Sequence, residues 1–164
     1  MIKLENVTKK YGKFEALKGI SFEVKEGEIV GLLGANGAGK STTMNIITGF
    51  IEQTSGTVIV DKYDVLKKPN KAKKLIGYMP EGVPLYNELT VKEFVRYMAE
   101  LKRVPKKEIK DKVKKTLEDT GLLEVQNKLI RNLSRGYKQR VSLAGTLVSE
   151  PKVIILDEPT VGLD

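Results

Sequence analysis

A short segment of the chain has the residue types and spacing of a phosphate-binding loop. Residues 34–41 read Gly-Ala-Asn-Gly-Ala-Gly-Lys-Ser, which matches the pattern G-x-x-x-x-G-K-S/T. The glycines let successive backbone N–H groups curl around phosphate oxygens, and a following helix adds its positive N-terminal end. In this pattern Lys40 contacts the β- and γ-phosphates, and the Ser41 hydroxyl binds Mg²⁺. The alternative is a Gly-rich turn that carries a surface lysine.

Two carboxylates follow an apolar run near the end of the sequence. Asp157 and Glu158 come directly after Val-Ile-Ile-Leu at 153–156, a run typical of a buried strand. A carboxylate at a strand end can hold Mg²⁺ through water, and the next one can polarise an attacking water as a general base. Many strands end in an acidic turn, but together with the phosphate-binding loop this pair predicts a nucleoside triphosphatase.

The composition excludes several other chemistries. The 164 residues contain no Cys and no His, which removes thiolate nucleophiles, disulfides, His-based acid–base catalysis and Cys or His metal sites. A metal must therefore bind oxygen ligands, which favours Mg²⁺. No apolar run approaches the roughly 18 residues of a membrane-spanning helix, and the first residues lack a signal peptide's apolar stretch. We expect a cytoplasmic protein.

The positive charge is concentrated in the middle of the chain. The formal net charge is +8, and residues 62–115 hold all of the Lys and Arg excess. Such a segment can be a nucleic-acid footprint, a membrane-proximal surface or a solvated helical face. The lysines alternate with apolar residues at helical spacing, and the segment does not show the interleaved aromatic residues of a base-stacking surface. This pattern favours the solvated helical face.

Strand patterns lie toward both ends of the chain, and helical patterns lie between them. We expect short strands within residues 1–30, including 21–25 and a doubly buried strand at 29–33, and further strands at 57–60, 76–79 and 153–156. We expect helices over 41–48, from Thr90 to about Leu101, from about Ile109 to Gly121, and from Ser134 to before Pro151. Thr90 and Glu93 have the spacing of a capping box. The order predicts an α/β core with an inserted helical block.

A third motif opens the last of these helices. Residues 133–140 read Leu-Ser-Arg-Gly-Tyr-Lys-Gln-Arg. At this point the sequence resembles the ATP-binding subunit of an ABC transporter, whose signature is L-S-G-G-Q. Leu133, Ser134 and Gly136 match, whereas positions 135 and 137 depart in a way similar to the branch that serves drug, lantibiotic and gliding-motility exporters of the ABC-2 type. Ser134 is also compatible with a plain helix N-cap.

The resemblance extends along the whole chain and assigns roles to further residues. It implies that Tyr11 stacks on adenine, that Glu81 stands in the Q-loop where the family has Gln, and that residues 161–164 form the D-loop. The implied nucleotide contacts are Tyr11, Gly34, Asn36, Gly37, Ala38, Gly39, Lys40, Ser41, Thr42, Ser134, Gly136 and Asp164. The implied catalytic residues are Glu158, Lys40 and Glu81, and the implied Mg²⁺ ligands are Ser41, Glu81 and Asp157. Tyr11 and Glu81 also fit an ordinary strand tyrosine and an exposed loop acid.

The resemblance implies a P-loop NTPase fold of the RecA-like α/β type, with an N-terminal antiparallel β lobe and an inserted helical subdomain. Residues 1–164 would form one nucleotide-binding domain. Its β lobe and core would comprise residues 1–81 and 150–164. Its helical subdomain, which includes the signature helix, would comprise residues 82–149. The implied function is ATP–Mg²⁺ binding and hydrolysis that powers export through a separate membrane permease. The implied partners are that permease and a second nucleotide-binding subunit, identical or paralogous, with no direct contact to nucleic acid. The protein would lie peripherally at the inner face of the cell membrane.

The sequence ends at Asp164, directly after the D-loop, whereas the family normally continues with another core strand and a switch His. We therefore expect an incomplete domain, with an uncovered sheet edge that lowers stability or promotes association. Two alternatives follow: an ATP-binding fragment without turnover, and a non-transport ABC ATPase that acts on nucleic acid. The transported substrate is not encoded in these motifs.

Overall fold

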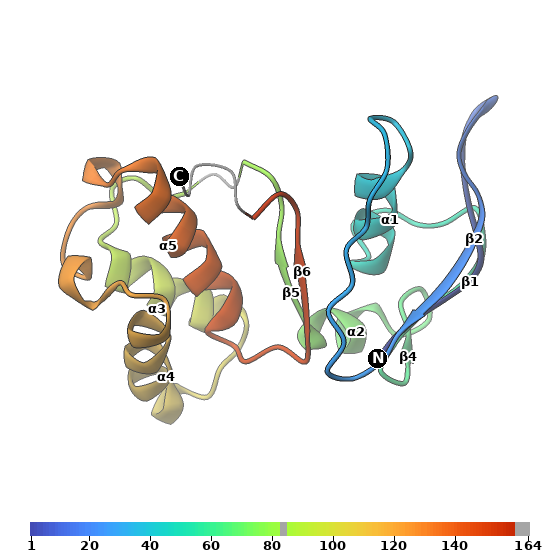
Figure 1. The fold of residues 1–164 in the computed structure, drawn as a ribbon. Coiled ribbons are helices and arrows are strands. Elements are labelled where there is room, and N and C mark those ends of the chain that lie inside the picture. The colour runs from blue at the N-terminus through green and yellow to red at the C-terminus, as the bar shows by residue number, and fades with distance from the viewer. Residues whose placement is uncertain (83–84, 160–164) are drawn as a thin grey trace. The chain divides into compact units, whose positions relative to one another are not determined.

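The computed structural model describes residues 1–82 and 85–159. It divides the chain into two compact units, Met1–Ile76 and Gly77–Asp164 (Figure 1). None of the helices among the described residues is long and apolar enough to cross a membrane.

The first unit is built on a four-stranded antiparallel sheet. Its strands are β1 (Ile2–Tyr11), β2 (Phe14–Val24), β3 (Ser55–Val60) and β4 (Tyr63–Asp64), in the order β2-β1-β3-β4. Leu4 of β1 stands opposite Phe22 on one side and Val58 on the other. Instead of short strands, the first 24 residues form one long hairpin, because Gly12 adopts a positive φ of 57° at its turn.

Two helices accompany this sheet. Helix α1 (Lys40–Ile47) follows the Gly-rich loop, as the sequence predicts, and buries Thr43, Ile46 and Ile47. Helix α2 (Pro69–Leu75) begins with a proline, whose fixed φ suits the first turn of a helix. Helix α1 packs on β2 and β3, and α2 packs on β3 and β4, so both helices cover the sheet within the first unit.

The predicted buried strand at 29–33 is wrong. Residues 29–33 have no regular secondary structure, and Ile29 and Leu33 are 101% and 93% exposed. A strand requires a neighbouring backbone to complete its hydrogen-bond ladder, and no described strand pairs with this segment. The apolar run therefore identifies a candidate strand sequence, but the ladder that would make it one is not formed.

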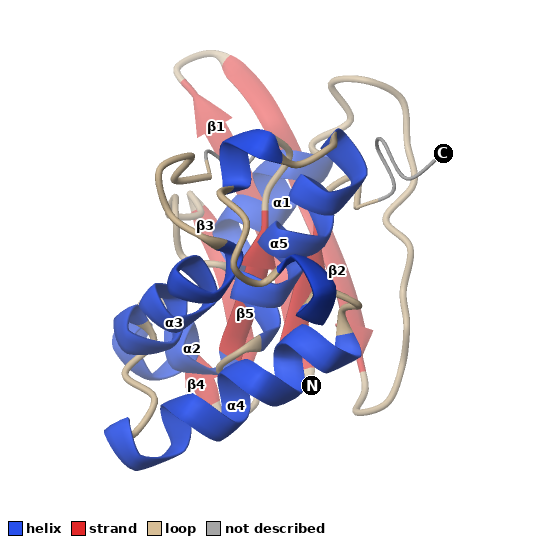
Figure 2. Cartoon of the chain, turned by 90° about the vertical axis from the view of Figure 1, so that its left-hand side faces the viewer, coloured by secondary structure: helices blue, strands red, loops and turns tan. Residues whose placement is uncertain are grey.

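The second unit combines a two-stranded sheet with a helical core. Strands β5 (Ile76–Met79) and β6 (Val153–Leu156) pair with each other (Figure 1). The helices are α3 (Val91–Leu101), α4 (Lys106–Asp119) and α5 (Arg135–Leu147), with 3₁₀ turns at Leu123–Val125 and Ile130–Asn132 (Figure 2). The apolar core that these helices share includes Val91, Phe94, Val95, Val113, Leu117, Ile130, Val141 and Ala144.

The helix boundaries in this unit follow local signals in the sequence. The capping box at α3 is confirmed: the Thr90 hydroxyl accepts from the Glu93 N–H, and the Glu93 carboxylate accepts from the Thr90 N–H at 2.8 Å. Gly121 follows α4 with a positive φ of 66°, the conformation that favours glycine after a helix. The Ser134 hydroxyl caps α5 by accepting from the Tyr137 N–H. These signals are local, which is why the sequence alone reveals them.

Candidate nucleotide-binding site

The Gly-rich loop in the first unit has a conformation that requires glycine. Gly37 and Gly39 have φ angles of 80° and 89°, in the left-handed region. A Cβ atom on Gly39 would lie 2.5 Å from Leu17 Cδ2 and 2.8 Å from the Ala16 carbonyl oxygen. Both the backbone angle and the packing against β2 therefore exclude a side chain at Gly39. At Gly37 only the angle does so, because a Cβ there would meet open space.

The ammonium group of Lys40 spans this loop. Its Nζ donates to the carbonyl oxygens of Gly34 at 2.7 Å and Ala35 at 2.9 Å. An ammonium group has three N–H donors, so one remains for a phosphate oxygen. Within the loop, the Ala38 N–H donates to the Ala35 carbonyl at 3.1 Å, while Asn36 and Ala38 are exposed. The loop therefore presents a positive charge that its own backbone holds in place.

The N-terminus of α1 is available to an anion. Within residues 34–47, which the structure describes completely, no side chain caps α1 and no acidic residue lies in its first turn. The Thr43 hydroxyl does not occupy these N–H groups, because it donates its proton to the Gly39 carbonyl oxygen at 2.8 Å. Ser41 is exposed and Thr42 is half-buried. The first N–H groups and the helix dipole are therefore free to bind phosphate, and the loop fits a nucleoside triphosphate.

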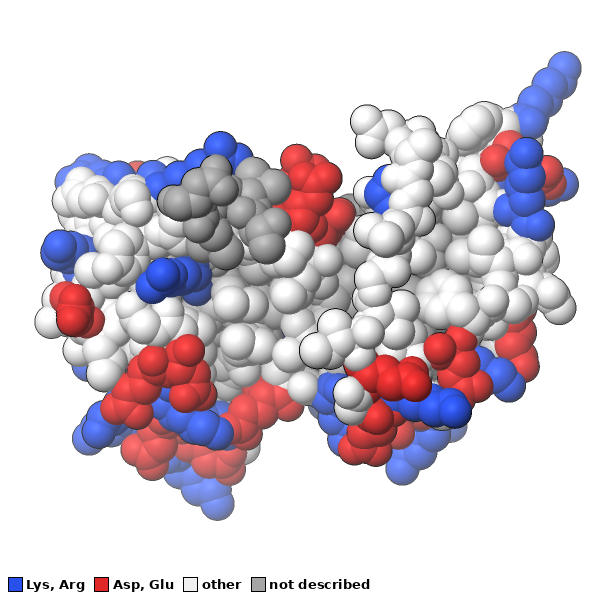
Figure 3. Space-filling view, viewed as in Figure 1, with Lys and Arg blue, Asp and Glu red and all other residues white. Residues whose placement is uncertain are grey.

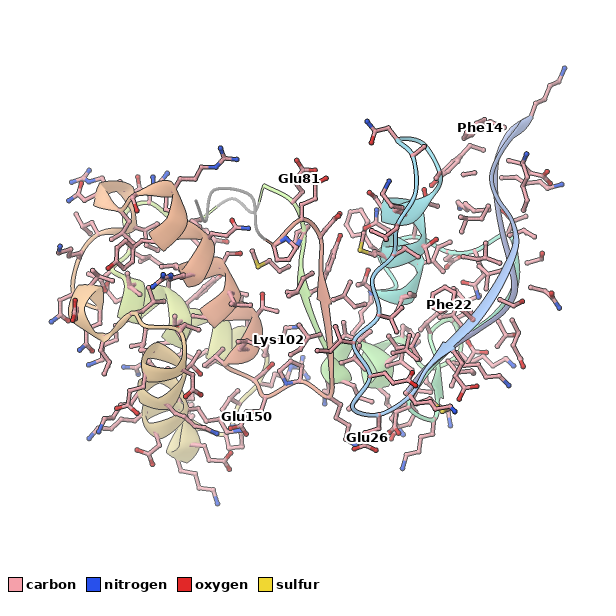
Figure 4. The ribbon with its side chains drawn as sticks, in the orientation of Figure 1. Phe14, Phe22, Glu26, Glu81, Lys102 and Glu150 are labelled. Atoms are coloured by element: carbon pink, nitrogen blue, oxygen red, sulfur yellow. The ribbon has the colours of Figure 1, made fainter. Side chains whose placement is uncertain are left out.

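The aromatic candidate Tyr11 lies at the end of β1, in the same unit. Its side chain is half exposed, and Lys9 Nζ lies 5.0 Å from the ring centroid. The structure also shows a second aromatic residue that the sequence analysis missed: Phe14 pairs with Tyr11 across the turn and is exposed (Figure 4). The spacing Tyr-Gly-Lys-Phe was the available signal, since a tight turn places its two flanking residues opposite each other.

The acidic candidates are in the second unit. The Asp157 N–H donates to the Met79 carbonyl at 2.9 Å, so β5 and β6 end at the same edge of their sheet. Asp157 is half-buried there, and the exposed Glu81 lies beyond the same end of β5 (Figure 4). Burial, with a smaller contribution from Asp157, raises the pKa of Tyr78. The negative charge of Asp157 is thus held close to this strand end, where it can act on a cation.

Glu158 has an unusual backbone conformation for its residue type. It is exposed and adopts a positive φ of 50°, which non-glycine residues seldom occupy. Such conformations are enriched at functional sites, where the surrounding structure holds them. No group of three or more Asp or Glu side chains among the described residues is arranged to hold a metal ion on its own.

The signature residues also lie in the second unit, at the start of α5. Ser134 is exposed at the N-cap, and Gly136 is half-buried in the first turn. Gln139 of the same helix donates from Nε2 to the Pro159 carbonyl at 3.3 Å, which ties α5 to the segment that follows Glu158. The sequence analysis missed Gln139, because nothing in the local pattern indicates a contact twenty residues away. Asp164 and the rest of 161–164 lie outside the described residues.

The candidate residues fall into two groups. Tyr11, Lys40, Ser41 and the remainder of the loop belong to the first unit, and Glu81, Asp157, Glu158, Ser134 and Gly136 belong to the second. Within the second unit, the pairing of β5 and β6 places Asp157 and Glu81 at the same strand end. The loop, the helix that follows it and the paired carboxylates define the class of P-loop nucleotide-binding proteins.

Comparison with known proteins places the chain within this class. The model of the ABC transporter family matches residues 17–161, and the chain belongs to that family. It is 41% identical over its full length to the linearmycin resistance ATP-binding protein of Bacillus subtilis, covering 53% of that protein. It is 38% identical to a probable multidrug ABC transporter ATP-binding protein of Escherichia coli, covering all of this chain and 28% of that protein. The chain thus spans about half the length, or less, of these curated relatives.

Solved structures agree with the fold. The cbiO1 subunit of Clostridium perfringens, part of the ABC transporter complex cbiONQ, matches with a TM-score of 0.87 and 37% identity, over 99% of this chain and 67% of that one. A dimeric ATP-binding cassette in a post-hydrolysis state with ADP and Pi matches with a TM-score of 0.86 and 33% identity, over 100% and 76% of the two chains. These matches confirm the ABC ATPase fold that the motifs predict. The curated relatives also confirm the resemblance to ATP-binding subunits of the drug-resistance type.

Proposed function

We propose that the protein binds and hydrolyses ATP with Mg²⁺ and thereby powers export through a separate membrane permease. The observation that carries this proposal is the uncapped N-terminus of α1 behind Gly39, with the Lys40 ammonium held across the loop at 2.7 and 2.9 Å from two backbone carbonyls. This is a preorganised anion site, and its sequence pattern is that of a triphosphate loop.

In this proposal, different residues of the chain bind the phosphates, the adenine and Mg²⁺ and accept the proton. The loop N–H groups and Lys40 bind and orient the phosphates, and Tyr11 stacks on adenine. Ser41, Asp157 and Glu81 would supply oxygen ligands for Mg²⁺, and the bound ion would neutralise charge that develops on the phosphates. Glu158 accepts a proton from the attacking water as general base. Positioning and charge stabilisation supply most of the rate in phosphoryl transfer, which suits a site without His or Cys.

We further propose that two nucleotide-binding subunits complete the site. Ser134 and Gly136, and with them Asp164, would contact the nucleotide held by the partner subunit. The exposed Ser134 at a helix N-terminus and the dimeric state of a similar cassette support this arrangement. Residues 1–81 and 150–164 would then act as β lobe and core, and residues 82–149 as the helical subdomain.

The helical subdomain carries a surface that suits a permease contact. Tyr86, Tyr97 and Leu101 are exposed, and the rings of Tyr86 and Tyr97 meet edge to face with their centroids 5.4 Å apart. Exposed aromatic and aliphatic side chains of this kind are enriched at protein interfaces. We propose that this patch contacts the permease and so holds the protein at the inner face of the membrane.

The test is nucleotide binding by a Lys40→Ala variant, measured by titration with a fluorescent ATP analogue. We expect affinity to fall by about 10- to 100-fold, since a charge-assisted hydrogen bond contributes about 1.5–3 kcal/mol. Lys25→Ala is the matched control: it removes the same charge from an exposed position of the first unit outside the loop. Equal affinity of the two variants would contradict the proposed site.

A further inference from the structure

The hairpin of β1 and β2 carries two exposed aromatic side chains, one on each side of its turn. Tyr11 is the last residue of β1 and Phe14 is the first of β2, and the two stand directly opposite each other. Their exposed fractions are 50% and 62%. Residues that stand opposite in an antiparallel pair project to the same face, with Cβ atoms about 5 Å apart. The hairpin therefore presents two aromatic rings on one face.

This face of the hairpin is the one that meets the phosphate-binding loop. Lys9 precedes Tyr11 by two residues, so the two side chains share a face, and Lys9 stands opposite Leu17 of β2. Leu17 is buried, and its Cδ2 atom lies 2.5 Å from the position that a Cβ on Gly39 would take. The rings of Tyr11 and Phe14 thus share a face with the side chain that packs against the loop.

The opposite face of the hairpin is charged. Lys10 stands opposite Glu15, and their side chains form an ion pair at 2.7 Å. In Figure 3 the charged side chains of the first unit gather along its edges, whereas the surface between the phosphate-binding loop and the hairpin is largely uncharged. This surface suits a flat, uncharged group better than an ionic one.

Lys9 covers one face of the Tyr11 ring. Its Nζ atom lies over the ring, 5.0 Å from the centroid, and donates to the Glu52 carbonyl oxygen at 2.7 Å. A cation in this position is attracted to the aromatic face, so a ligand must approach the ring from the other side. Within the hairpin, all of whose residues the structure describes, the rings of Tyr11 and Phe14 do not stack on each other. Both rings therefore keep a surface that a ligand can reach.

We propose that Phe14 supplies a second aromatic surface for the base of the bound nucleotide and thereby favours purines over pyrimidines. The proposal rests on the nucleotide binding proposed above and adds a residue that selects the base. Phe14 precedes Leu17 by three residues, which span about 10 Å of strand. The base and the phosphates of one nucleoside triphosphate are separated by a comparable length. A two-ring purine can cover both aromatic side chains, whereas a one-ring pyrimidine covers less of them.

Single-stranded nucleic acid is the other ligand whose bases stack on exposed aromatic side chains. It fits this hairpin less well, because the neighbouring loop offers Lys40 and the uncapped N-terminus of α1 to a cluster of phosphates. A polynucleotide carries its phosphates singly between sugars, whereas a nucleoside triphosphate carries three in a row. The test therefore includes single-stranded RNA as a competing outcome.

The variants separate the ring from its bulk. Phe14→Ala removes the side chain, Phe14→Leu keeps its apolar character without the ring, and Phe14→Tyr keeps the ring. Phe50→Ala is the matched control, because it deletes the same side chain from a position that is 79% exposed in the same unit. Phe50 follows the C-terminal end of α1, whereas the phosphate-binding loop precedes the N-terminal end.

The experiment is calorimetric titration of the full-length protein with ATP, with UTP and with inorganic tripolyphosphate, which has no base. We expect the wild type to bind ATP more tightly than UTP. Phe14→Ala and Phe14→Leu should lower the affinity for ATP by about 10-fold, lower that for UTP less, and leave that for tripolyphosphate unchanged. Phe14→Tyr and Phe50→Ala should keep the wild-type affinity for ATP.

Several results would overturn the proposal. Unchanged ATP affinity in Phe14→Ala would do so while leaving the phosphate-binding site in place, and so would equal losses in Phe14→Ala and Phe50→Ala. If tripolyphosphate binding falls as much as ATP binding, the effect does not involve the base. Tighter binding of single-stranded RNA than of ATP, lost in Phe14→Ala, would assign the aromatic pair to nucleic acid. A wild-type protein that binds neither ATP nor tripolyphosphate would contradict the proposed function as well.

Discussion

The backbone N–H of Asp157 donates to the carbonyl of Met79 at 2.9 Å, and this bond aligns the ends of β5 and β6. The side chain of Asp157 is not involved, so the strand pairing fixes where the carboxylate lies without using its oxygens. Glu81 follows β5 by two residues and therefore emerges at the same edge (Figure 4). Two acidic side chains from distant parts of the sequence thus share one end of a sheet, as the Mg²⁺ proposal requires.

Asp157→Asn is expected to weaken Mg²⁺-dependent nucleotide binding while the fold remains intact. The amide replaces an anionic oxygen ligand with a neutral one, and the bond to Met79 is preserved because it uses the backbone. Calorimetric titration with ATP, in Mg²⁺ and in EDTA, measures the difference. If Mg²⁺ improves binding equally in the variant and the wild type, Asp157 is not a ligand of the ion.

Gly39→Ala is expected to destabilise the protein by about 1–3 kcal/mol and to abolish nucleotide binding, because it combines a positive φ with a clash against Leu17 and Ala16. Gly37→Ala is the matched control. It has a similar φ but an open surrounding, so its cost should stay near 1 kcal/mol. Urea unfolding gives both values. Equal destabilisation by the two variants would show that packing against β2 does not constrain the loop.

Gly145→Ala is expected to destabilise the helical core by about 1–3 kcal/mol through overpacking. A Cβ atom at this position would lie 2.8 Å from Phe94 Cε1 and 3.1 Å from Met98 Cγ, so α3 and α5 would have to separate. Phe94→Leu in the same chain should recover part of the loss. The explanation would be contradicted if the double variant lost more unfolding free energy than the two single variants lose when their losses are added.

The capping box at α3 predicts a pH dependence. Hydrogen bonds from the Thr90 backbone and hydroxyl lower the pKa of Glu93 from its ordinary value of 4.5. A lowered pKa in the folded state stabilises the protein above the unfolded value, and this contribution is lost as the pH falls through the folded value. The stability difference between the wild type and Glu93→Gln should therefore be present at neutral pH and shrink in acid. A difference that stays constant with pH would rule out the charge as its origin.

Thr90→Ala removes the hydroxyl half of the same motif. We expect a loss of about 1 kcal/mol at neutral pH, read from the midpoint of urea unfolding. Thr90→Ser keeps the hydroxyl group and is expected to restore most of the stability. If Ser and Ala are equivalent at this position, the hydroxyl does not cap the helix.

Much of the second unit was predictable because its signals are local. Thr90 and Glu93 mark a helix start three residues apart, and Gly121 marks a helix end by its own conformational freedom. The phosphate-binding loop is also local, since glycines, Lys40 and the following helix are consecutive. The family comparison confirms the fold that these motifs predict.

The features that escaped prediction depend on distant partners. The run at 29–33 has a strand-like sequence, but a strand also needs a neighbour, and the sequence does not say whether one is present. Phe14 beside Tyr11 depends on the register of a hairpin, and the bond from Gln139 to Pro159 joins residues on separate elements. The cavity between α3 and α4 likewise arises only when the two helices pack together, because residues of both helices line it.

The measurement that tests the central claim most directly is steady-state, Mg²⁺-dependent ATP hydrolysis by the full-length protein, with ATP binding followed in parallel. The account predicts that Glu158→Gln binds ATP but loses turnover by about 100-fold or more, as expected when a general base is removed. Hydrolysis at the wild-type rate by Glu158→Gln would contradict the role assigned to this carboxylate. Binding without turnover in the wild type would contradict the proposed ATPase activity itself.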